Sequence, residues 1–529
     1  MSAPSSRAPT GTGRPLVGTD PRDGRPVGDG VPEAGPAQAA AAAEAAAEAL
    51  RNRPPAGAPG GFDDAALLDA VAAGLEDAAP DLAELAERET GLGADRLRGE
   101  VVRTVHQLRA FAGAHRDGLL ADAIIDTGGP AEGGDPARPD QRRVARPLGP
   151  VAVFSASNFP FAFSTAGGDT ASALAAGCPV ILKAHPDHPA TSRATGEVVD
   201  AAVAGTGAPA DWFQVLHGGA TELGQALVTA PDVAAVAFTG SLRGGRALFD
   251  ATTRREVPIP VFAEMSSVNP VVVTPAALAG RGGAIGELLA GTVVGSAGQL
   301  CTKPNLVLTV RGPGLQDLVD AMVEILRRAP ELVMLTGRLR DAFDTSWHRL
   351  VRTPGVEEVV AAETLPRDGA WESPGLARVS AAVLLARPDL LEERFGPGTV
   401  VAVADDLPEL TRLAGQVPGS LTATVHAEPG EAVPEQLLAV LASRAGRLVW
   451  NGVPTGVTVG YATVHGGPYP ATTAPSTTSV GMTAARRFQR PVGYQSWPDP
   501  LLPAELRDAN PLGIVRLVDG VPTRAAVRR

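Results

Sequence analysis

The sequence predicts an α/β fold built on a parallel sheet, followed by a second α/β domain. Between residues 148 and 246, short apolar segments alternate with helical segments at the spacing of βαβ units. The apolar segments are continuous runs without period-2 alternation, which is typical of parallel strands covered on both faces. With 529 residues the chain exceeds one ordinary hydrophobic core, so two or three domains are expected.

The amino-terminal part is predicted to be a lead-in followed by helices. Residues 1–36 are rich in Gly, Pro and Asp, and we expect them to be extended or disordered. Residues 127–146, rich in Gly, Pro and charge, predict a linker or an exposed two-stranded arm. Between these segments, alanine content and helical periodicity predict helices at Ala37–Leu50, Phe62–Ala78, Leu82–Thr90 and Ala94–Ala114.

The predicted sheet begins after Leu148. Its first four strands are Pro150–Phe154, Cys178–Lys183, Phe213–Leu216 and Val233–Phe238, with helices expected at 164–176, 192–203 and 223–228 and after Gly240. Two more strands, Val261–Glu264 and Val271–Val273, precede the helix that leads to Cys301, and residues 305–450 suggest the second domain. Ligands of such sheets bind at the carboxyl ends of the strands, beside helix N-termini.

Composition excludes several classes of protein. A net charge of -12 argues against a nucleic-acid binder, which would carry a basic patch. Two cysteines cannot build a disulfide framework, and their scarcity fits a reducing cytoplasm. The amino-terminal residues have no apolar core of a signal peptide, and no run of about twenty apolar residues predicts a membrane span.

Cys301 is the most informative residue of the chain. Small or polar neighbours in Gly295–Gln299 would allow a substrate to approach it, whereas Cys178 begins an apolar strand and is expected to be core. Glu264 ends an apolar strand, where a carboxylate is costly unless it is solvated or functional. A thiol and a carboxylate suggest covalent catalysis followed by activation of water. Asn158 adds an amide donor for an oxyanion, and no metal site is predicted.

Together these motifs resemble the aldehyde dehydrogenase superfamily over roughly residues 40 to 505. The matching segments are Asn158-Phe159-Pro160, Lys183, Phe238-Thr239-Gly240-Ser241 with Gly245, Glu264, Gly298-Gln299-Leu300-Cys301, Glu393-Arg394-Phe395-Gly396-Pro397 and Asn451-Gly452. Other segments resemble the 2,5-dioxovalerate (α-ketoglutarate semialdehyde) dehydrogenases and the NADP-dependent fatty aldehyde dehydrogenases. They include Lys183-Ala184-His185-Pro186, Cys301-Thr302-Lys303-Pro304 and Val464-His465-Gly466-Gly467.

The resemblance implies a mechanism and a set of site residues. Cys301 attacks an aldehyde, Asn158 and the Cys301 backbone N–H hold the oxyanion, and Glu264 activates water to hydrolyse the thioester. The implied cofactor-binding residues are Lys183 at a ribose hydroxyl, Ser241 with Gly240 and Gly245 near a phosphate, and Glu393 with Phe395 at the nicotinamide ribose.

The resemblance also implies an aldehyde dehydrogenase-like domain arrangement. It comprises an NAD(P)-binding domain of Rossmann type (37–126 and 149–262), a catalytic domain (263–487), an oligomerisation arm (127–148 and 488–505) and a C-terminal tail (506–529). A homodimer or homotetramer in the cytoplasm is expected, without nucleic-acid or membrane partners.

One position, three residues after Lys183, indicates which cofactor the chain prefers. NAD-preferring relatives often place a Glu three residues after the strand-end lysine, and here that residue is Pro186. Loss of the carboxylate removes repulsion against a 2′-phosphate, so NADP is predicted, with NAD as an alternative. His185, His188 and Arg243 are candidate partners of that phosphate, or simply solvated loop residues.

The substrate expected from the resemblance is α-ketoglutarate semialdehyde, oxidised to 2-oxoglutarate. The alternatives are a broad aliphatic or fatty aldehyde dehydrogenase and a catalytically silent homologue. A distal carboxylate would need an arginine at the pocket mouth, and Arg103 and Arg109 are alternatives because residues six apart do not share a helix face. Phe159 and His465 are further pocket candidates, although a structural turn histidine is equally plausible. Lys303 has no assigned chemical role.

Overall fold

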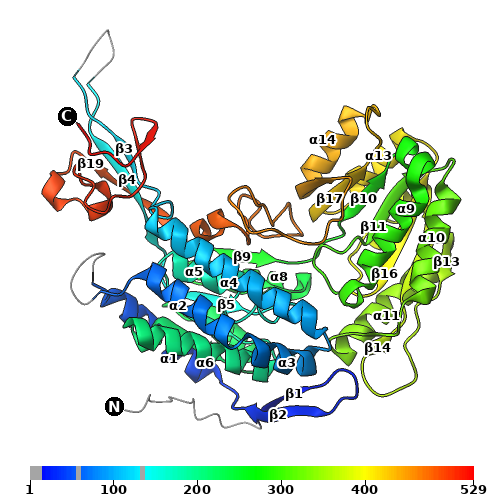
Figure 1. The fold of residues 1–529 in the computed structure, drawn as a ribbon, viewed down its shortest axis with the longest axis horizontal. Helices are drawn as coiled ribbons and strands as arrows, with labels where there is room; N and C mark the ends of the chain where they lie inside the picture. The colour runs from blue at the N-terminus through cyan, green and yellow to red at the C-terminus, as the bar shows by residue number, and fades with distance from the viewer. Residues whose placement is uncertain (1–14, 55–60, 131–136, 529) are drawn as a thin grey trace.

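The computed structural model describes residues 15–54, 61–130 and 137–528, and it confirms the α/β fold class (Figure 1). Residues 1–14 of the expected lead-in lie outside the described part. Two sheets with mainly parallel strands form the two large bodies of the molecule, and a smaller sheet projects from one of them as an arm (Figure 1). None of the described helices is long and apolar enough to cross a membrane.

The first sheet has five parallel strands in the order β7-β6-β5-β8-β9. The chain moves outward in one direction from β5 to β7 and in the other from β8 to β9, so the order reverses between β5 and β8. In such sheets the crevice at this reversal is where ligands bind. The strands are β5 (Val151–Phe154), β6 (Val180–Lys183), β7 (Phe213–Leu216), β8 (Ala235–Thr239) and β9 (Val261–Glu264).

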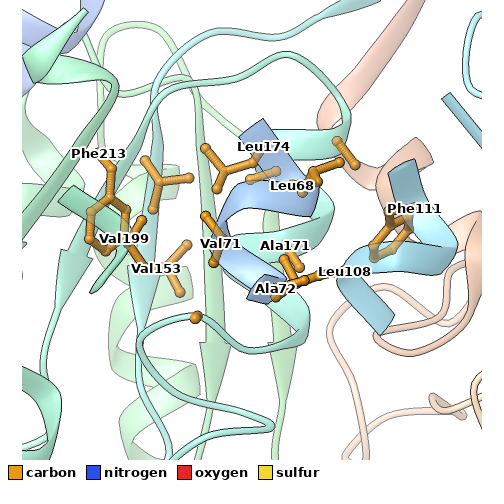
Figure 2. Close-up of a cluster of buried hydrophobic side chains, with 14 of the residues drawn as sticks. Leu68, Val71, Ala72, Leu108, Phe111, Val153, Ala171, Leu174, Val199 and Phe213 are labelled. Atoms are coloured by element: carbon orange, nitrogen blue, oxygen red, sulfur yellow. The ribbon is translucent and has the colours of Figure 1, made fainter. Parts of the chain in front are cut away.

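Helices cover both faces of this sheet because alternate strand residues point to opposite sides. Val151 and Val153 of β5 pack into the core formed with α2 to α6, part of which is shown in Figure 2. Ala152 and Phe154 pack into the core formed with α1, α7 and α8. The helices are α1 (Pro36–Arg51), α2 (Asp64–Asp77), α3 (Ala79–Thr90), α4 (Ala94–Arg116), α5 (Gly168–Ala175), α6 (Pro189–Thr206), α7 (Thr221–Thr229) and α8 (Leu242–Thr253).

A buried carboxylate ties α3 to the start of α6. The Glu89 carboxylate accepts hydrogen bonds from the backbone N–H groups of Ala190 and Thr191 at 2.9 and 2.7 Å. These N–H groups belong to the first turn of α6, where the helix leaves its donors unpaired and favours negative charge. The helix that carries Glu89 ends at once, because Gly91 adopts a left-handed conformation with φ 66°.

The second sheet has seven strands in the order β13-β15-β16-β11-β10-β17-β18, all parallel to their neighbours except β13. Its strands are β10 (Pro270–Val273), β11 (Leu306–Val310), β13 (Val356–Val360), β15 (Gly375–Ser380), β16 (Gly398–Ala404), β17 (Ser420–His426) and β18 (Ala445–Trp450). Its helices are α9 (Pro275–Val294), α10 (Leu315–Arg328), α11 (Gly337–Val351), α12 (Ala381–Ala386), α13 (Leu407–Gln416) and α14 (Glu435–Arg444).

The arm is a five-stranded sheet in the order β19-β4-β3-β20-β21. Its strands are β3 (Ile124–Asp126), β4 (Gln141–Pro147), β19 (Gln489–Gln495), β20 (Arg516–Val518) and β21 (Val521–Thr523). The buried Arg142 side chain joins these segments, because it forms ion pairs with Asp140 at 2.8 Å and with Asp508 at 2.7 Å. Residues after 506, predicted as a separate tail, therefore complete the arm sheet.

The described part of the lead-in is an ordered hairpin, which agrees with the extended alternative of the prediction and not with the disordered one. Strands β1 (Leu16–Thr19) and β2 (Pro26–Val31) pair antiparallel. The turn between them contacts Trp371 of the second large body through its backbone. The Arg22 carbonyl accepts a hydrogen bond from Trp371 Nε1 at 2.8 Å. Arg22 also forms an ion pair with Glu87 of α3 at 3.1 Å. These contacts with residues distant in the sequence order the segment, and amino-acid composition does not encode them.

Candidate active site

Cys301 lies in a turn just after the 3₁₀ helix η2 (Gly295–Gly298), which follows α9. Ser296 and Ala297 both have φ 53°, a left-handed conformation that is costly for residues with a Cβ. Gly298 has φ +66°, and a Cβ there would lie 2.1 Å from the Gly396 carbonyl oxygen. The loop that presents the thiol is therefore strained and packed tightly against the loop that follows Glu393.

Three reactive side chains from distant segments meet at this loop. The Cys301 Sγ lies 3.6 Å from His465 Nε2, and the same nitrogen lies 3.0 Å from Glu264 Oε1. Ser479 Oγ donates to the other carboxylate oxygen of Glu264 at 2.8 Å. Glu264 and His465 are buried. His465 therefore contacts both the thiol and the carboxylate.

The environment sets the protonation of this cluster. Burial raises the pKa of the Cys301 thiol well above its usual range, and the negative charges of Glu264 and Glu393 add to the effect. Burial alone would raise the pKa of Glu264 as well, but His465 and the Ser479 hydroxyl outweigh it and hold that pKa below its ordinary value. The resting site therefore combines a protonated thiol with an ionised carboxylate.

Asn158 follows β5 and faces the thiol loop. Its Nδ2 donates to the Gln299 carbonyl at 3.0 Å, two residues before Cys301. Helix α4 holds the Asn158 loop in place, since Arg96 donates to the Asn158 carbonyl at 2.7 Å. The buried Glu100 carboxylate accepts from the backbone N–H of Phe161 at 2.8 Å. This contact places the Asn158 amide beside the loop that carries the thiol.

Two residues without an assigned role in the sequence support the nucleophile. Asn269, also left-handed with φ 53°, donates through Nδ2 to the carbonyls of Cys301 and Lys303 at 2.9 and 3.0 Å. The buried Lys303 donates through Nζ to the carbonyls of Arg394, Gly396 and Gly398 at 2.7, 3.0 and 2.5 Å. Burial lowers the pKa of Lys303 to about 7. Lys303 thus joins the thiol loop to the loop of Glu393 and makes no contact that suggests a substrate ligand.

Glu393 lies on that second loop, close to the end of β9. Burial raises its pKa to about 7, while Lys303 and hydrogen bonds from Ser266 and Ser267 oppose the rise. Phe395, two residues on, is half-buried. The negative charge of Glu393 acts on the Cys301 thiol, which places this loop near the sulfur.

Residues expected to hold a cofactor gather at the carboxyl edge of the first sheet. Lys183 ends β6, and burial lowers its pKa. Ser241 caps α8, its Oγ accepting from Gly244 N–H at 3.2 Å. Gly245 lets α8 approach β9, because a Cβ there would lie 2.7 Å from Met265. Gly240 donates its N–H to the Glu264 carbonyl at 3.0 Å. An ammonium and an exposed helix N-terminus at one edge fit a dinucleotide.

The three candidate partners of a 2′-phosphate lie in different environments. His188 is fully buried and bonds to Ser192 Oγ at 3.1 Å and to the Ala156 carbonyl at 3.0 Å, so the expectation that it reaches a phosphate is wrong. Arg243 is exposed on α8, and His185 is half-buried beside Asp187.

Of the two arginine alternatives on α4, the structure places Arg103 at the site. Its guanidinium lies 5.3 Å from the centre of the Phe163 ring, and that ring lies 5.9 Å from the His465 ring. Nε donates to the Val457 carbonyl at 3.3 Å, but both terminal nitrogens are buried without a partner among the described residues. Phe159 packs edge-on against Phe163 at 5.2 Å.

Arg109 is excluded from the site. It is exposed and pairs with Glu76 on α2. The reason is the helical period: six residues at about 100° each leave the Arg109 side chain about 120° around α4 from Arg103.

Comparison with known proteins places these features in context. Residues 10–331 match the profile of the aldehyde dehydrogenase family. The chain is 48% identical over 457 residues to alpha-ketoglutaric semialdehyde dehydrogenase 2 of Azospirillum brasilense, covering 86% of this chain and 87% of the relative. It is 42% identical over 461 residues to alpha-ketoglutaric semialdehyde dehydrogenase of Acinetobacter baylyi, covering 87% of each. The fold resembles an NAD-dependent aldehyde dehydrogenase from Sinorhizobium meliloti, with a TM-score of 0.75, 24% identity and coverage of 91% and 90%.

Proposed function

Because this chain belongs to the aldehyde dehydrogenase family, we propose that it oxidises α-ketoglutarate semialdehyde to 2-oxoglutarate with NAD(P). The observation that carries the chemistry is the meeting of Cys301, His465 and Glu264, a thiol and an ionised carboxylate on either side of one imidazole nitrogen. The two relatives named for this substrate support its identity, since each is similar over most of its length.

The first half of the reaction needs a thiolate. The thiol is protonated at rest, so its proton must leave as Sγ attacks the aldehyde carbon. The oxyanion of the thiohemiacetal would be held by the Asn158 amide and the Cys301 backbone N–H. When bound, the nicotinamide accepts hydride, and a thioester remains on Cys301.

The second half needs a base that is ionised before water arrives. Glu264 meets this condition, because its pKa is held low in spite of burial. The hydrogen bond from Ser479 orients one carboxylate oxygen, and the other can take a proton from the attacking water. Collapse of the resulting intermediate releases the carboxylic acid and restores the thiol.

The cofactor proposed is NADP, with NAD also accepted. Pro186 supplies no carboxylate toward the adenosine ribose, and the Asp187 carboxylate is paired with Arg338 at 3.4 Å. The amine of Lys183 and the exposed Arg243 leave positive charge available at this edge. We further propose that Lys183, Ser241, Gly240, Gly245, Glu393 and Phe395 form the cofactor site, and that the protein is a cytoplasmic homo-oligomer assembled through the arm.

Arg103 is proposed to receive the distal carboxylate of the substrate. Its two unpaired terminal nitrogens are buried, and such donors cost free energy until an acceptor reaches them. The pKa of Arg103 is lowered by burial and raised by Glu100, Cys301 and Glu264, which places the guanidinium within electrostatic reach of the reacting groups. A guanidinium binds a carboxylate through two parallel hydrogen bonds, which suits the acid end of a semialdehyde.

The test is an aldehyde panel with NADP⁺ and with NAD⁺. We expect kcat/KM for α-ketoglutarate semialdehyde to exceed that for hexanal, and Arg103→Met to lower only the former, by about 10²-fold. Arg109→Met, a change of the same type on the same helix, should leave both rates unaltered. Equal rates with hexanal and with the semialdehyde would contradict the proposed substrate. If no aldehyde led to reduction of the cofactor, the chain would be a catalytically silent homologue.

A further inference from the structure

The residues that carry the proposed chemistry also form a set of metal ligands. Within residues 15–54, 61–130 and 137–528, the Cys301 sulfur, a His465 ring nitrogen and a Glu264 carboxylate oxygen all lie within 4.8 Å of one another. We propose that these three side chains bind a zinc-class divalent cation when cofactor and aldehyde are absent, and that the cation inhibits the enzyme reversibly.

The spacing of the ligand atoms matches a tetrahedral site. Bond lengths of zinc to sulfur, nitrogen and oxygen give edges of ~3.3–3.6 Å between ligand atoms in a tetrahedron. The observed separations are 3.6 Å from Sγ to Nε2 and 3.0 Å from Nε2 to Oε1. The third separation, between Sγ and the Glu264 oxygen, is at most 4.8 Å, so side-chain rotations would bring the three atoms to one cation. Three protein ligands leave one position open, which water would fill.

The charges of the site also favour a divalent ion over the proton it would displace. Binding forms a sulfur–metal bond, and the thiol proton leaves to solvent. The Cys301 thiolate and the Glu264 carboxylate then carry two negative charges, which the cation neutralises beside a neutral imidazole. A neutral complex costs much less to bury than a lone thiolate. A thiolate and an imidazole select zinc or cobalt over magnesium or calcium, which prefer oxygen ligands.

The surroundings permit this change of state. His465 Nδ1 has no partner among the described residues, so a proton can move there from Nε2, and the cation would replace the hydrogen bond between Nε2 and Glu264. Glu264 keeps the hydrogen bond from Ser479. Ser479 would not touch the metal, but its hydrogen bond would orient the carboxylate that does. The bound cation would occupy the sulfur that attacks the aldehyde and the carboxylate that activates water, so both halves of the reaction would stop.

The experiment uses Co²⁺ as a spectroscopic probe on the full-length protein, treated with chelator and free of cofactor. We expect one Co²⁺ per chain, with a thiolate-to-cobalt charge-transfer band that Zn²⁺ abolishes. Cys301→Ser should lose the band, and His465→Gln should weaken Co²⁺ binding by more than the ~10- to 100-fold that an outer contact contributes. The matched control is Cys178→Ser, which should keep the band because Cys178 is buried in the core.

Activity gives a second readout. Zn²⁺ should inhibit the wild-type enzyme, and a chelator should restore its full rate. A band that survives in Cys301→Ser, Co²⁺ binding without a band in the wild type, or inhibition that chelator does not reverse would each overturn the proposal. The cobalt measurement needs neither aldehyde nor cofactor, so it stands or falls separately from the dehydrogenase activity.

Discussion

Glu264 contacts His465, Ser479 and the Cys301 thiol, and we propose that it serves the second half of the reaction. His465 lies against one carboxylate oxygen and Ser479 against the other. The carboxylate remains ionised and ready for water.

Replacing Glu264 with Gln should therefore separate the two halves. We expect Glu264→Gln to give one rapid equivalent of reduced cofactor per active site, followed by a steady rate lower by about 10²–10⁴-fold. Stopped-flow absorbance and intact-mass detection of the acylated chain would measure this. A variant that loses the rapid phase as well would show that Glu264 also serves the attack by sulfur.

The thiol should react with alkylating reagents only at high pH. Because burial and Glu264 raise the pKa of Cys301, the thiolate fraction at pH 8 is below that of a free cysteine and grows as pH rises. Removing the negative charge in Glu264→Gln lowers that pKa, so its iodoacetamide rate profile should shift toward lower pH.

Peptide mass mapping provides the control within the same chain. Burial raises the pKa of Cys178 to about 12, so this residue should stay unmodified in the folded protein. An unshifted profile in Glu264→Gln would contradict the electrostatic account.

At this scale the sequence predicts which residues are reactive but not how they touch. Cys301, Glu264 and Asn158 stand in motifs, and the structure brings them to one place. The contact of His465 with Glu264 joins residues 201 positions apart, and no local pattern encodes it. Lys303 is conspicuous in sequence as one of two lysines, yet its three carbonyl partners lie more than 90 residues away.

Among the elements, the segment from Gly295 to Cys301 is the most constrained. Two consecutive left-handed residues store strain, and contacts from Lys303 and Asn269 hold the following turn in place. Such strain persists only where the surroundings over-determine the conformation, as they do at many reactive loops.

Gly298→Ala tests this constraint. The new Cβ would need a left-handed φ and would lie 2.1 Å from the Gly396 oxygen, so we expect a loss of at least about 3 kcal/mol in the free energy of unfolding. Gly291→Ala is the matched control: it lies in α9 with nothing within 4 Å, and it should be neutral or stabilising by up to about 1 kcal/mol. Urea unfolding compares them, and equal midpoints would contradict the packing argument.

For the elements, prediction from sequence succeeds where periodicity is local. The strands of the first sheet and the long α4 follow from apolar runs and helical spacing. The hairpin of β1 and β2 has short strands, and contacts of its turn with Trp371 and Glu87 add to the hydrogen bond between Asp20 and Arg25 that closes the turn. Residues after 506 likewise join the arm through Arg142, a contact that only the folded chain reveals.

In the whole molecule, two edge strands of the described sheets lie at or near exposed apolar side chains. Strand β18 closes the seven-stranded sheet and exposes Leu448 (50%) and Trp450 (55%), and β19 closes the arm sheet near the exposed Trp497. Long exposed edges with apolar side chains pair with other chains unless they are protected. The proposed homo-oligomer would use these edges.

We expect the double change Leu448→Glu and Trp450→Glu to shift the protein to monomers at micromolar concentration. Charges at the edge would disfavour pairing with a second copy. Light scattering coupled to gel filtration would measure the mass. Val102→Glu, at an exposed position of α4 far from either edge strand in sequence, is the control and should leave the mass unchanged. A double variant of unaltered mass would place the interface elsewhere.

The near absence of lysine has a practical consequence for labelling. Of the 46 Lys and Arg residues, only Lys183 and Lys303 carry an ε-amine. Lys303 is buried, and its Nζ donates hydrogen bonds to three backbone carbonyls. A reagent that acylates amines would thus find one side-chain target, at the strand end where the dinucleotide is proposed to bind. Its incorporation would serve as a direct gauge of how much of that site is filled.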